Sequence, residues 1–325
     1  MRDFIRPKLV ASKCLGFAPC RWNAQIISND FVKLLGKHAD FQTVCPEVEI
    51  GLGIPRNPIR VVDDHGRLVL YQPATGKDFS KPMEEFCESY LKGVGGVDGF
   101  ILKGSSPSCG IKNVKIYSGF ENPSVKEKGS GFFGKAVVDM FPDLAVEDDE
   151  RLANVMIREH FLTKLFTIAR FREVQMLRDP AELVNFHSDN KFLLMAFSQK
   201  ELRELGHIVA NQKKAGIDEA IRSYRQRLMA AISRPPKKGS MVNALMHIFG
   251  YFSEKLSSQE KKFFMDTIDG YRSGKMPLIV SLNLTRSLVT RFGIDYLLRQ
   301  TILEPYPADL LSFPTYDEDR DYWHF

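Results

Sequence analysis

Short apolar runs, separated by turn residues and helical patterns, dominate the first half of the chain. These runs predict strands at residues 8–12, 41–45 and 99–102, and a hairpin formed by residues 59–62 and 68–71. Apolar residues at helical spacing predict helices at residues 31–37 and 82–92. Strands that alternate with helices in this way are typical of an α/β domain with a mainly parallel sheet.

Helical periodicity dominates the second half, with apolar residues at steps of three and four at Phe161, Leu165 and Ile168. The acidic cluster 147–150 suits a helix start, because carboxylates favour the positive end of the helix dipole. Only residues 278–280 have strand character. Two pairs have the spacing of a capping box: Ser198 with Glu201, and Ser257 with Glu260. We therefore expect an all-α C-terminal domain.

The chain has 325 residues and a mass of 37.0 kDa, more than one compact core usually holds. We expect an N-terminal domain at residues 1–148, a helical domain at residues 149–311 and an acidic, aromatic tail at residues 312–325. A composition of 44% hydrophobic and 26% charged residues excludes a disordered or fibrous protein.

The longest uncharged run, residues 239–253, is too short to span a membrane. With no leader pattern before the first strand, we expect a cytoplasmic protein with no membrane partner.

Three of the five cysteines share a sequence context. Cys14, Cys45 and Cys109 each follow an apolar run and open a loop rich in turn residues. The loops after parallel strands meet at one edge of a sheet, so we expect these thiols to lie together. Such a trio suits an iron–sulfur cluster with one open iron, or zinc with a water, although no close cysteine pair typical of zinc sites is present. A thiol nucleophile and ordinary buried cysteines are the other interpretations.

Residues 8 to about 140 resemble the TudS family of thiouracil desulfurases. The resemblance rests on three blocks in order: Ser12-Lys-Cys14-Leu-Gly16 with Cys20-Arg21, Cys45-Pro-Glu47 with Gly51-Leu-Gly-Ile-Pro55-Arg56, and Lys103 with Ser106-Pro-Ser-Cys109-Gly110. It implies a Rossmann-like α/β domain in which Cys14, Cys45 and Cys109 hold a [4Fe-4S] cluster. It also implies that Glu47 and Ser106 are the catalytic pair beside the open iron.

Each of these residues also has a structural interpretation. Glu47 follows a proline and suits a helix N-terminus, whereas Ser106 precedes a proline and suits the start of a turn. Cys20 is interpreted as a loop residue, with a thiol that supports the cluster ligands or a sulfur acceptor as alternatives. Cys87 is interpreted as a core residue on the apolar face of its helix. Three basic residues flank the proposed ligands and suit charge balance, phosphate binding or a solvated surface: Arg21, Arg56 and Lys103.

Residues from about 160 to 310 resemble the YbgA-like helical domain, through Leu183-Val-Asn-Phe186-His187, Lys191, Leu193-Leu-Met195-Ala and Leu205-Gly206. One departure is Phe197, where the family often has a histidine before Ser198. A TudS-like domain joined to a YbgA-like one resembles the RudS proteins, which are tRNA 4-thiouridine desulfidases. In that family the helical domain is thought to engage tRNA.

Positive charge is concentrated in residues 151–325, which carry 26 Lys+Arg against 20 Asp+Glu, whereas residues 1–150 carry 19 against 20. The run 213–238 alone holds eight basic and two acidic residues, with Tyr224 among them for stacking. Basic clusters of this kind follow RNA backbones; a solvated helix face is the alternative. The residues expected to contact RNA are His187, Lys191, Arg222, Arg225, Lys237 and Lys238. A hydrogen-bonded histidine beside the core is the other interpretation of His187.

Taken with these resemblances, the sequence predicts an enzyme that uses a [4Fe-4S] cluster to remove sulfur from 4-thiouridine in tRNA. The reaction yields uridine and hydrosulfide without electron transfer, and thiolated tRNA is the expected partner. A first alternative keeps the chemistry but takes free thiouracil or another small thiolated metabolite as substrate. A second alternative is a non-catalytic iron–sulfur protein that binds nucleic acid. The presence of Glu47 and Ser106 argues against it, because such a protein needs no catalytic pair.

Overall fold

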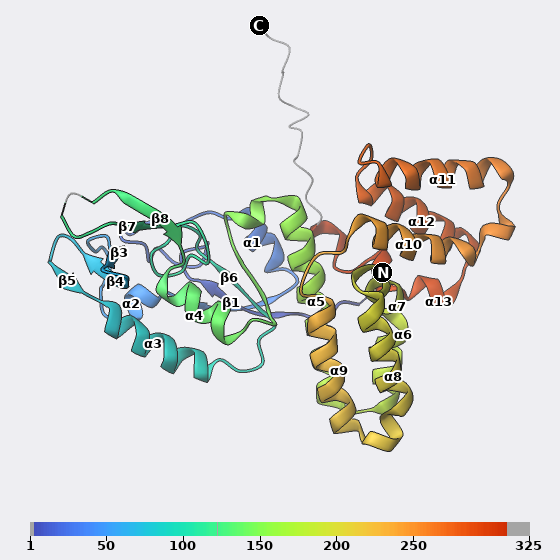
Figure 1. Ribbon diagram of the computed structural model, residues 1–325, viewed down its shortest axis with the longest axis horizontal. Helices are drawn as coiled ribbons and strands as arrows, with labels where there is room; N and C mark the ends of the chain where they lie inside the picture. Colours follow the sequence, from blue (N-terminus) through green and yellow to red (C-terminus); the bar gives the residue numbers. More distant parts are fainter. Residues whose placement is uncertain (1–2, 122, 311–325) are drawn as a thin grey trace, which may run out of the picture. The chain divides into compact units, whose positions relative to one another are not determined.

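The computed structural model describes residues 3–121 and 123–310 (Figure 1). The chain divides into two compact units: Met1–Ala169, to which the chain returns at Tyr306, and Arg170–Pro305. The predicted domain boundary at residue 148 stays a prediction, and the predicted tail, 312–325, lies outside the described residues. Within the described residues, no helix has both the length and the apolar character that crossing a membrane requires.

The first unit is built on a four-stranded sheet in the order β2-β1-β6-β9. Its strands are β1 (Lys8–Ser12), β2 (Asp40–Val44), β6 (Gly99–Leu102) and β9 (Ala145–Asp148). All neighbours are parallel, which confirms the predicted α/β class. Every residue of β6 is buried, as expected of a parallel strand covered on both faces. Gly99 is required by close packing, because a Cβ there would lie 2.4 Å from the carbonyl oxygen of Ala145.

Four helices accompany this sheet before the long helix α5 (Val155–Leu177) begins. They are α1 (Asp30–Leu35), α2 (Pro46–Glu49), α3 (Ser80–Gly93) and α4 (Phe132–Met140). The predicted helices at 31–37 and 82–92 correspond to α1 and α3. The core joins Leu9 and Ile101 of the sheet to Leu35 of α1 and to Phe161 and Leu165 of α5.

A second, five-stranded sheet has the order β5-β4-β3-β7-β8. Its strands are β3 (Arg60–Asp64), β4 (Arg67–Gln72), β5 (Lys77–Asp78), β7 (Val114–Tyr117) and β8 (Val125–Gly129). The antiparallel pair β3–β4 confirms the predicted hairpin. The rest of this sheet was not predicted, because β5 and β8 are mostly exposed and polar and therefore carry no apolar pattern.

The acidic cluster 147–150 leads into a short 3₁₀ helix, η1 (Arg151–Ala153), rather than directly into a long α-helix: Glu150 is the N-cap of η1, and Asp148 accepts a hydrogen bond from the backbone N–H of Arg151 at 2.8 Å. Strand β9 runs to Asp148, and α5 begins only at Val155. The acidic side chains instead pair with basic groups: Glu147 with Arg151 at 2.7 Å, and Glu150 with Lys103 at 2.8 Å. The cluster therefore precedes a short helical turn and also forms ion pairs.

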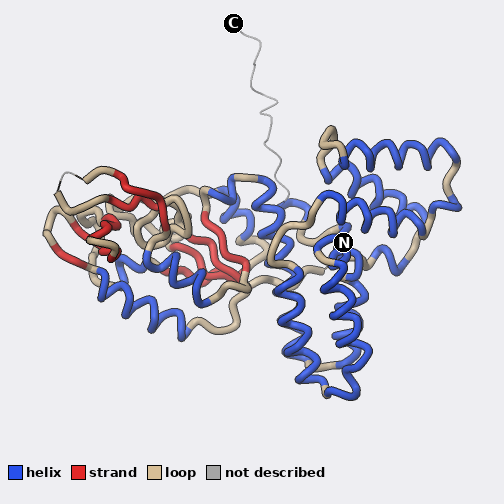
Figure 2. The backbone as a smooth tube through the Cα atoms, in the orientation of Figure 1, coloured by secondary structure: helices blue, strands red, loops and turns tan. Residues whose placement is uncertain are grey.

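Beyond α5, the described residues of the second unit form only helices and loops, as Figure 2 shows. The α-helices are α6 (Pro180–Asp189), α7 (Lys191–Phe197), α8 (Gln199–Ala215), α9 (Ile217–Ala231), α10 (Lys238–Gly250), α11 (Ser258–Arg272), α12 (Leu278–Phe292) and α13 (Asp295–Leu298). The helical C-terminal class is therefore confirmed. The suspected strand at 278–280 was wrong, because these residues form the first turn of α12.

Capping fixes the starts of two of these helices at the predicted residues. Ser198 accepts a hydrogen bond from the backbone N–H of Glu201 at 3.3 Å and begins α8. Ser257 and Glu260 form a reciprocal capping box at the start of α11, with the Glu260 carboxylate accepting from the Ser257 N–H at 2.8 Å. Both pairs satisfy donors that the first helical turn leaves unpaired.

The Ser257→Ala variant should lower the free energy of unfolding by about 1 kcal/mol, the usual cost of losing an N-cap hydroxyl. Ser258→Ala is the matched control, because that exposed serine is the first residue of the same helix and not its cap. Urea denaturation followed by far-UV circular dichroism measures both variants. Equal stability of the two variants would contradict the capping role of Ser257.

Candidate active site

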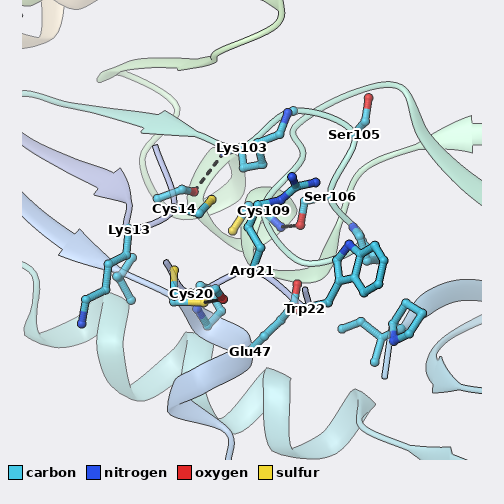
Figure 3. Close-up of a pocket in the computed structure, with 18 of the residues that line it drawn as sticks. Lys13, Cys14, Cys20, Arg21, Trp22, Glu47, Lys103, Ser105, Ser106 and Cys109 are labelled. Carbon is cyan, nitrogen blue, oxygen red and sulfur yellow. Dashed lines mark hydrogen bonds between the residues drawn. The ribbon is translucent and has the colours of Figure 1, made fainter. Parts of the chain in front are cut away.

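A cavity of about 340 Å³ opens where the parallel strands of the first sheet end. Cys14 lies two residues beyond β1, Cys45 follows β2 directly, and Cys109 lies in the loop that follows β6. All three line this cavity together with Glu47 and Ser106 (Figure 3). The structure thus brings together the five residues that the sequence singled out for one site.

The thiols of the cavity are mostly removed from water. Cys45 and Cys109 are buried, and Cys14 is half-buried. Burial raises the pKa of the Cys109 thiol, while a hydrogen bond with Cys20 and burial raise that of Cys45. A bound metal cation acts in the opposite direction, because it favours the thiolate form of a cysteine ligand.

Cys20 also lines the cavity, and it contacts the proposed ligands. A hydrogen bond with Cys14 is the main cause that raises the Cys20 pKa to about 11, and a second joins Cys20 to Cys45. The Cys45 thiol lies 3.6 Å from the carbonyl oxygen of Cys20. Cys20 is a loop residue, as predicted, and it also lies beside the other thiols, which was the alternative interpretation. Its distance of six residues from Cys14 gave no chelate spacing to reveal it.

The donor set fits a larger inorganic group better than a single ion. Across the described ranges, no three or more His, Cys, Asp or Glu residues are grouped so as to hold one metal ion. An iron–sulfur cluster binds several thiolates, each on a different iron, so its ligands can come from separate loops. Three thiols from three loops around one cavity have this arrangement, and they fit an iron–sulfur cluster held by Cys14, Cys45 and Cys109.

Glu47 is held on both of its carboxylate oxygens. It lies in the first turn of α2, with its side chain 14% exposed, and its Oε2 accepts from Nε and Nη2 of Arg56 at 2.8 and 2.7 Å. Its Oε1 accepts from the hydroxyl of Ser108 at 3.0 Å. Both partners are almost completely buried. Charge-assisted bonds of this kind fix the direction of a carboxylate.

Arg56 also forms hydrogen bonds with two loops beside the cavity. Its Nη1 donates to the carbonyl oxygens of Cys20 and Gly53, each at 3.0 Å. Sequence reasoning considered Arg56 for charge balance or phosphate binding, and it did not single out Ser108. Pairing with Glu47 leaves Arg56 little freedom to bind phosphate, so its place in the structure favours an internal role.

Ser106 lines the cavity from the loop after β6. Its Oγ accepts hydrogen bonds from the backbone N–H groups of Ser108 and Cys109 at 3.3 and 3.1 Å. This geometry is that of a serine at the start of a turn, the structural interpretation given for Ser106 from the sequence. Accepting these bonds leaves the hydroxyl proton able to donate. Ser106 therefore shapes the cysteine loop, and its hydroxyl also forms a hydrogen bond with the Cys109 thiol at the wall of the cavity.

Two further contacts hold this loop. Lys103 binds Asp149 and Glu150 at 3.2 and 2.8 Å, and Ser105 donates to the second oxygen of Glu150 at 2.6 Å. On the other side the first turn of α4 packs against the loop. A Cβ at Gly134 would lie 2.6 Å from the carbonyl oxygen of Cys109. Only glycine allows this close approach, which sets the position of Cys109.

The residues proposed for RNA binding all lie in the second unit. His187 of α6 is 3.1 Å from the hydroxyl of Tyr224, a contact that agrees with its structural interpretation. Tyr224 itself is fully buried, so the expectation that it is free to stack on a base was wrong. Lys191 at the start of α7 has its ammonium 5.6 Å from the centre of the Phe192 ring.

The remaining candidates lie on α9 and at the start of α10. Arg222 is exposed and pairs with Glu219 at 2.9 Å, whereas Arg225 on the same helix is half-buried. Lys237 and Lys238 are both exposed, and α10 begins at Lys238. The exposed basic side chains are compatible with RNA contact, and that contact stays a prediction.

Comparison with known families agrees with the two-part organisation. The family model described as 2-thiouracil desulfurase matches residues 9–149. The model described as "Protein of unknown function (DUF1722)" matches residues 191–307. The first match contains every residue of the cavity described above except Glu150, and the second lies within the helical part of the chain.

Similar proteins include representatives of both parts. "Uncharacterized protein YbgA" of Escherichia coli (strain K12) is 31% identical over 144 residues, covering 44% of this chain and 84% of the relative. "Uncharacterized protein YbbK" of Bacillus subtilis (strain 168) is 29% identical over 111 residues, covering 31% of this chain and 72% of the relative. Among solved structures, the [4Fe-4S]-dependent thiouracil desulfidase TudS is 25% identical, with a TM-score of 0.35, and the match covers 46% of this chain and 94% of that one. The chain belongs to the YbgA family, and it joins the helical DUF1722 domain to an N-terminal 2-thiouracil desulfurase domain.

Proposed function

We propose that this protein is an iron–sulfur-dependent desulfidase that converts 4-thiouridine in tRNA to uridine. The observation that carries the proposal is the meeting of three thiols, from three separate loops, with a fixed carboxylate in one cavity. The match of residues 9–149 to the 2-thiouracil desulfurase model supports removal of sulfur from thiouracil-type bases. The positive charge of the second half of the chain supports tRNA as the substrate.

Cys14, Cys45 and Cys109 would hold a [4Fe-4S] cluster and leave one iron without a protein ligand. When bound, the cluster supplies a Lewis acid that polarises the carbon–sulfur bond of the substrate. The surrounding chain contributes an environment of low polarity, since two of the three thiols are buried. The overall change replaces the C=S group and water with C=O and hydrogen sulfide, so no electron has to be supplied.

Glu47 accepts the proton of the attacking water in this proposal. Its Oε2 is held by Arg56 and its Oε1 accepts from Ser108, so the carboxylate cannot rotate away from the cavity. Ser106 orients the water or donates to the negative charge that develops on the substrate. Positioned acid–base groups of this kind typically contribute about 100- to 10,000-fold in rate.

The charge of the second half of the chain supports a nucleic-acid substrate. The basic run 213–238 includes exposed Arg222, Lys237 and Lys238, and phosphate contacts supply most of the affinity for nucleic acid. The cavity of about 340 Å³ has room for a base but not for a helix. A 4-thiouridine in tRNA would therefore have to leave its stack, at a cost of a few kcal/mol that backbone contacts offset.

The cavity size equally suits a free thiolated base, which is the alternative substrate. The description of the matching family model names 2-thiouracil, a small molecule, and this favours the alternative. A non-catalytic nucleic-acid-binding protein is less well supported. Such a protein would have no use for a carboxylate that is held on both oxygens at the wall of the cavity.

Iron and acid-labile sulfide per chain, measured after anaerobic purification, test the cluster ligands. Cys14→Ser, Cys45→Ser and Cys109→Ser should each lose most of both, because a cluster normally needs its thiolates. Cys87→Ser is the matched control, since this buried cysteine lies on α3 and does not line the cavity. Full retention of iron by any of the three variants would remove that residue from the proposed ligand set.

Glu47→Gln should lower the rate of hydrosulfide release from 4-thiouridine by about 100- to 10,000-fold, because the amide cannot accept the proton of water. Glu49→Gln is the matched control: it lies on the same helix, and its side chain is exposed. Iron content should remain unchanged in both variants. Equal release by wild type and Glu47→Gln would contradict the proposed role of Glu47.

Electrophoretic shifts with thiolated tRNA at several salt concentrations test the substrate. The double variant Lys237→Glu/Lys238→Glu should bind more weakly, and the slope of log affinity against log salt should fall by about 2 as two phosphate contacts are lost. The control is Lys261→Glu/Lys262→Glu on α11, which makes the same change in charge elsewhere. This control should bind thiolated tRNA more tightly than Lys237→Glu/Lys238→Glu. Equal weakening by both pairs would argue against a local contact. Turnover of free thiouracil as fast as tRNA, with no shift, would favour the small substrate.

A further inference from the structure

Trp22 exposes a large apolar side chain at the wall of the proposed active site. Its side chain lines the cavity that also contains the thiols and Glu47 (Figure 3). The residue nevertheless remains 47% exposed. Phe17 in the same loop is exposed to a similar degree, 41%, but it packs against Phe41 with ring centres 5.2 Å apart and does not line the cavity.

The backbone that carries Trp22 is held in place. The loop is closed by a hydrogen bond from the N–H of Ile27 to the carbonyl oxygen of Cys14 at 2.9 Å. The carbonyl oxygen of Trp22 accepts from the N–H of Arg56 at 2.8 Å, and the N–H of Ala24 donates to Arg21 at 2.9 Å. The indole is therefore presented by a fixed turn that is linked to the Arg56–Glu47 pair.

Among the described residues, no aromatic or cationic side chain stacks on the indole. Within residues 3–121 and 123–310, Trp22 has neither a ring contact nor a cation–π contact of the kind that ten or more other aromatic residues show. A single exposed aromatic side chain needs no explanation by itself. A tryptophan on the wall of a concave site is different, because such sites are lined by aromatic groups that contact their ligand.

We propose that Trp22 is the surface on which the pyrimidine ring of the substrate stacks, an inference that rests on the proposed function. The indole offers a flat π face, while Glu47 and Ser106 on the same cavity offer polar groups to the ring edge. Stacking does not depend on the groups at the edge of a base. Trp22 therefore binds uridine as well as 4-thiouridine and contributes affinity rather than discrimination for sulfur.

Tryptophan fluorescence measures this contact without turnover. The chain contains two tryptophans, Trp22 and Trp323, so Trp323→Phe leaves Trp22 as the only indole. Titration of that full-length variant with uridine, which has no sulfur to lose, should quench the emission in a saturable way. Absence of quenching at concentrations of uridine that inhibit hydrosulfide release competitively would overturn the proposal.

Steady-state kinetics with 4-thiouridine provide the second readout. Trp22→Ala should raise KM about tenfold, the effect of losing one base–aromatic stack, and should leave kcat and the iron content nearly unchanged. Trp22→Phe should restore most of the lost affinity, because it restores a flat ring. Phe17→Ala, the matched control in the same loop, should leave KM unchanged.

The outcomes separate this inference from the proposed function. Release of hydrosulfide by Trp22→Ala with an unchanged KM would overturn the stacking role and leave the desulfidase function intact. Saturable quenching by uridine, without hydrosulfide release from any thiolated base or tRNA, would support the stacking role while the proposed reaction fails. A fall in kcat with unchanged KM would also overturn stacking, since it would indicate a role in the chemical step.

Discussion

The parallel alignment of β1, β2 and β6 is the constraint on which the candidate site depends. Parallel neighbours end at the same edge of the sheet, so the loops that follow them meet there although their residues are far apart in sequence. The strands are held in this alignment by burial of their apolar side chains, which include Leu9 and Ile101. Cys14, Cys45 and Cys109 are thus brought together by the sheet.

Polar contacts then fix the direction of the side chains at this edge. The Arg56–Glu47 pair is nearly inaccessible to water, and removing one partner of such a pair typically costs about 3–5 kcal/mol because the other charge is left buried. Ser108 holds the second carboxylate oxygen. A site that stabilises charge in a reaction needs groups that are already oriented, and these contacts provide that orientation before substrate binds.

The two parts of the chain differ in the physical properties that binding requires. The α/β part buries its reactive groups in a cavity that admits little more than one base. The helical part carries an excess of basic residues, several of them exposed on α9 and at the start of α10. In the function proposed above, the long-range charge would serve to attract a polyanion and the confined cavity would serve for chemistry on one base.

The sequence alone determined the local features of this protein. Apolar runs located β1, β2, β6 and the β3–β4 hairpin, and serine–glutamate spacing located the starts of α8 and α11, because such features depend on neighbouring residues. The context of the three cysteines also placed them correctly in one cavity. Only the tertiary structure showed that the acidic cluster 147–150 leads into a single 3₁₀ turn and that Glu150 pairs with Lys103. It alone showed that Arg56 and Ser108 hold Glu47, that Cys20 contacts the other thiols, and that Tyr224 is buried. These outcomes depend on burial and on contacts between separate elements of the chain, which the pattern of apolar and polar residues does not encode.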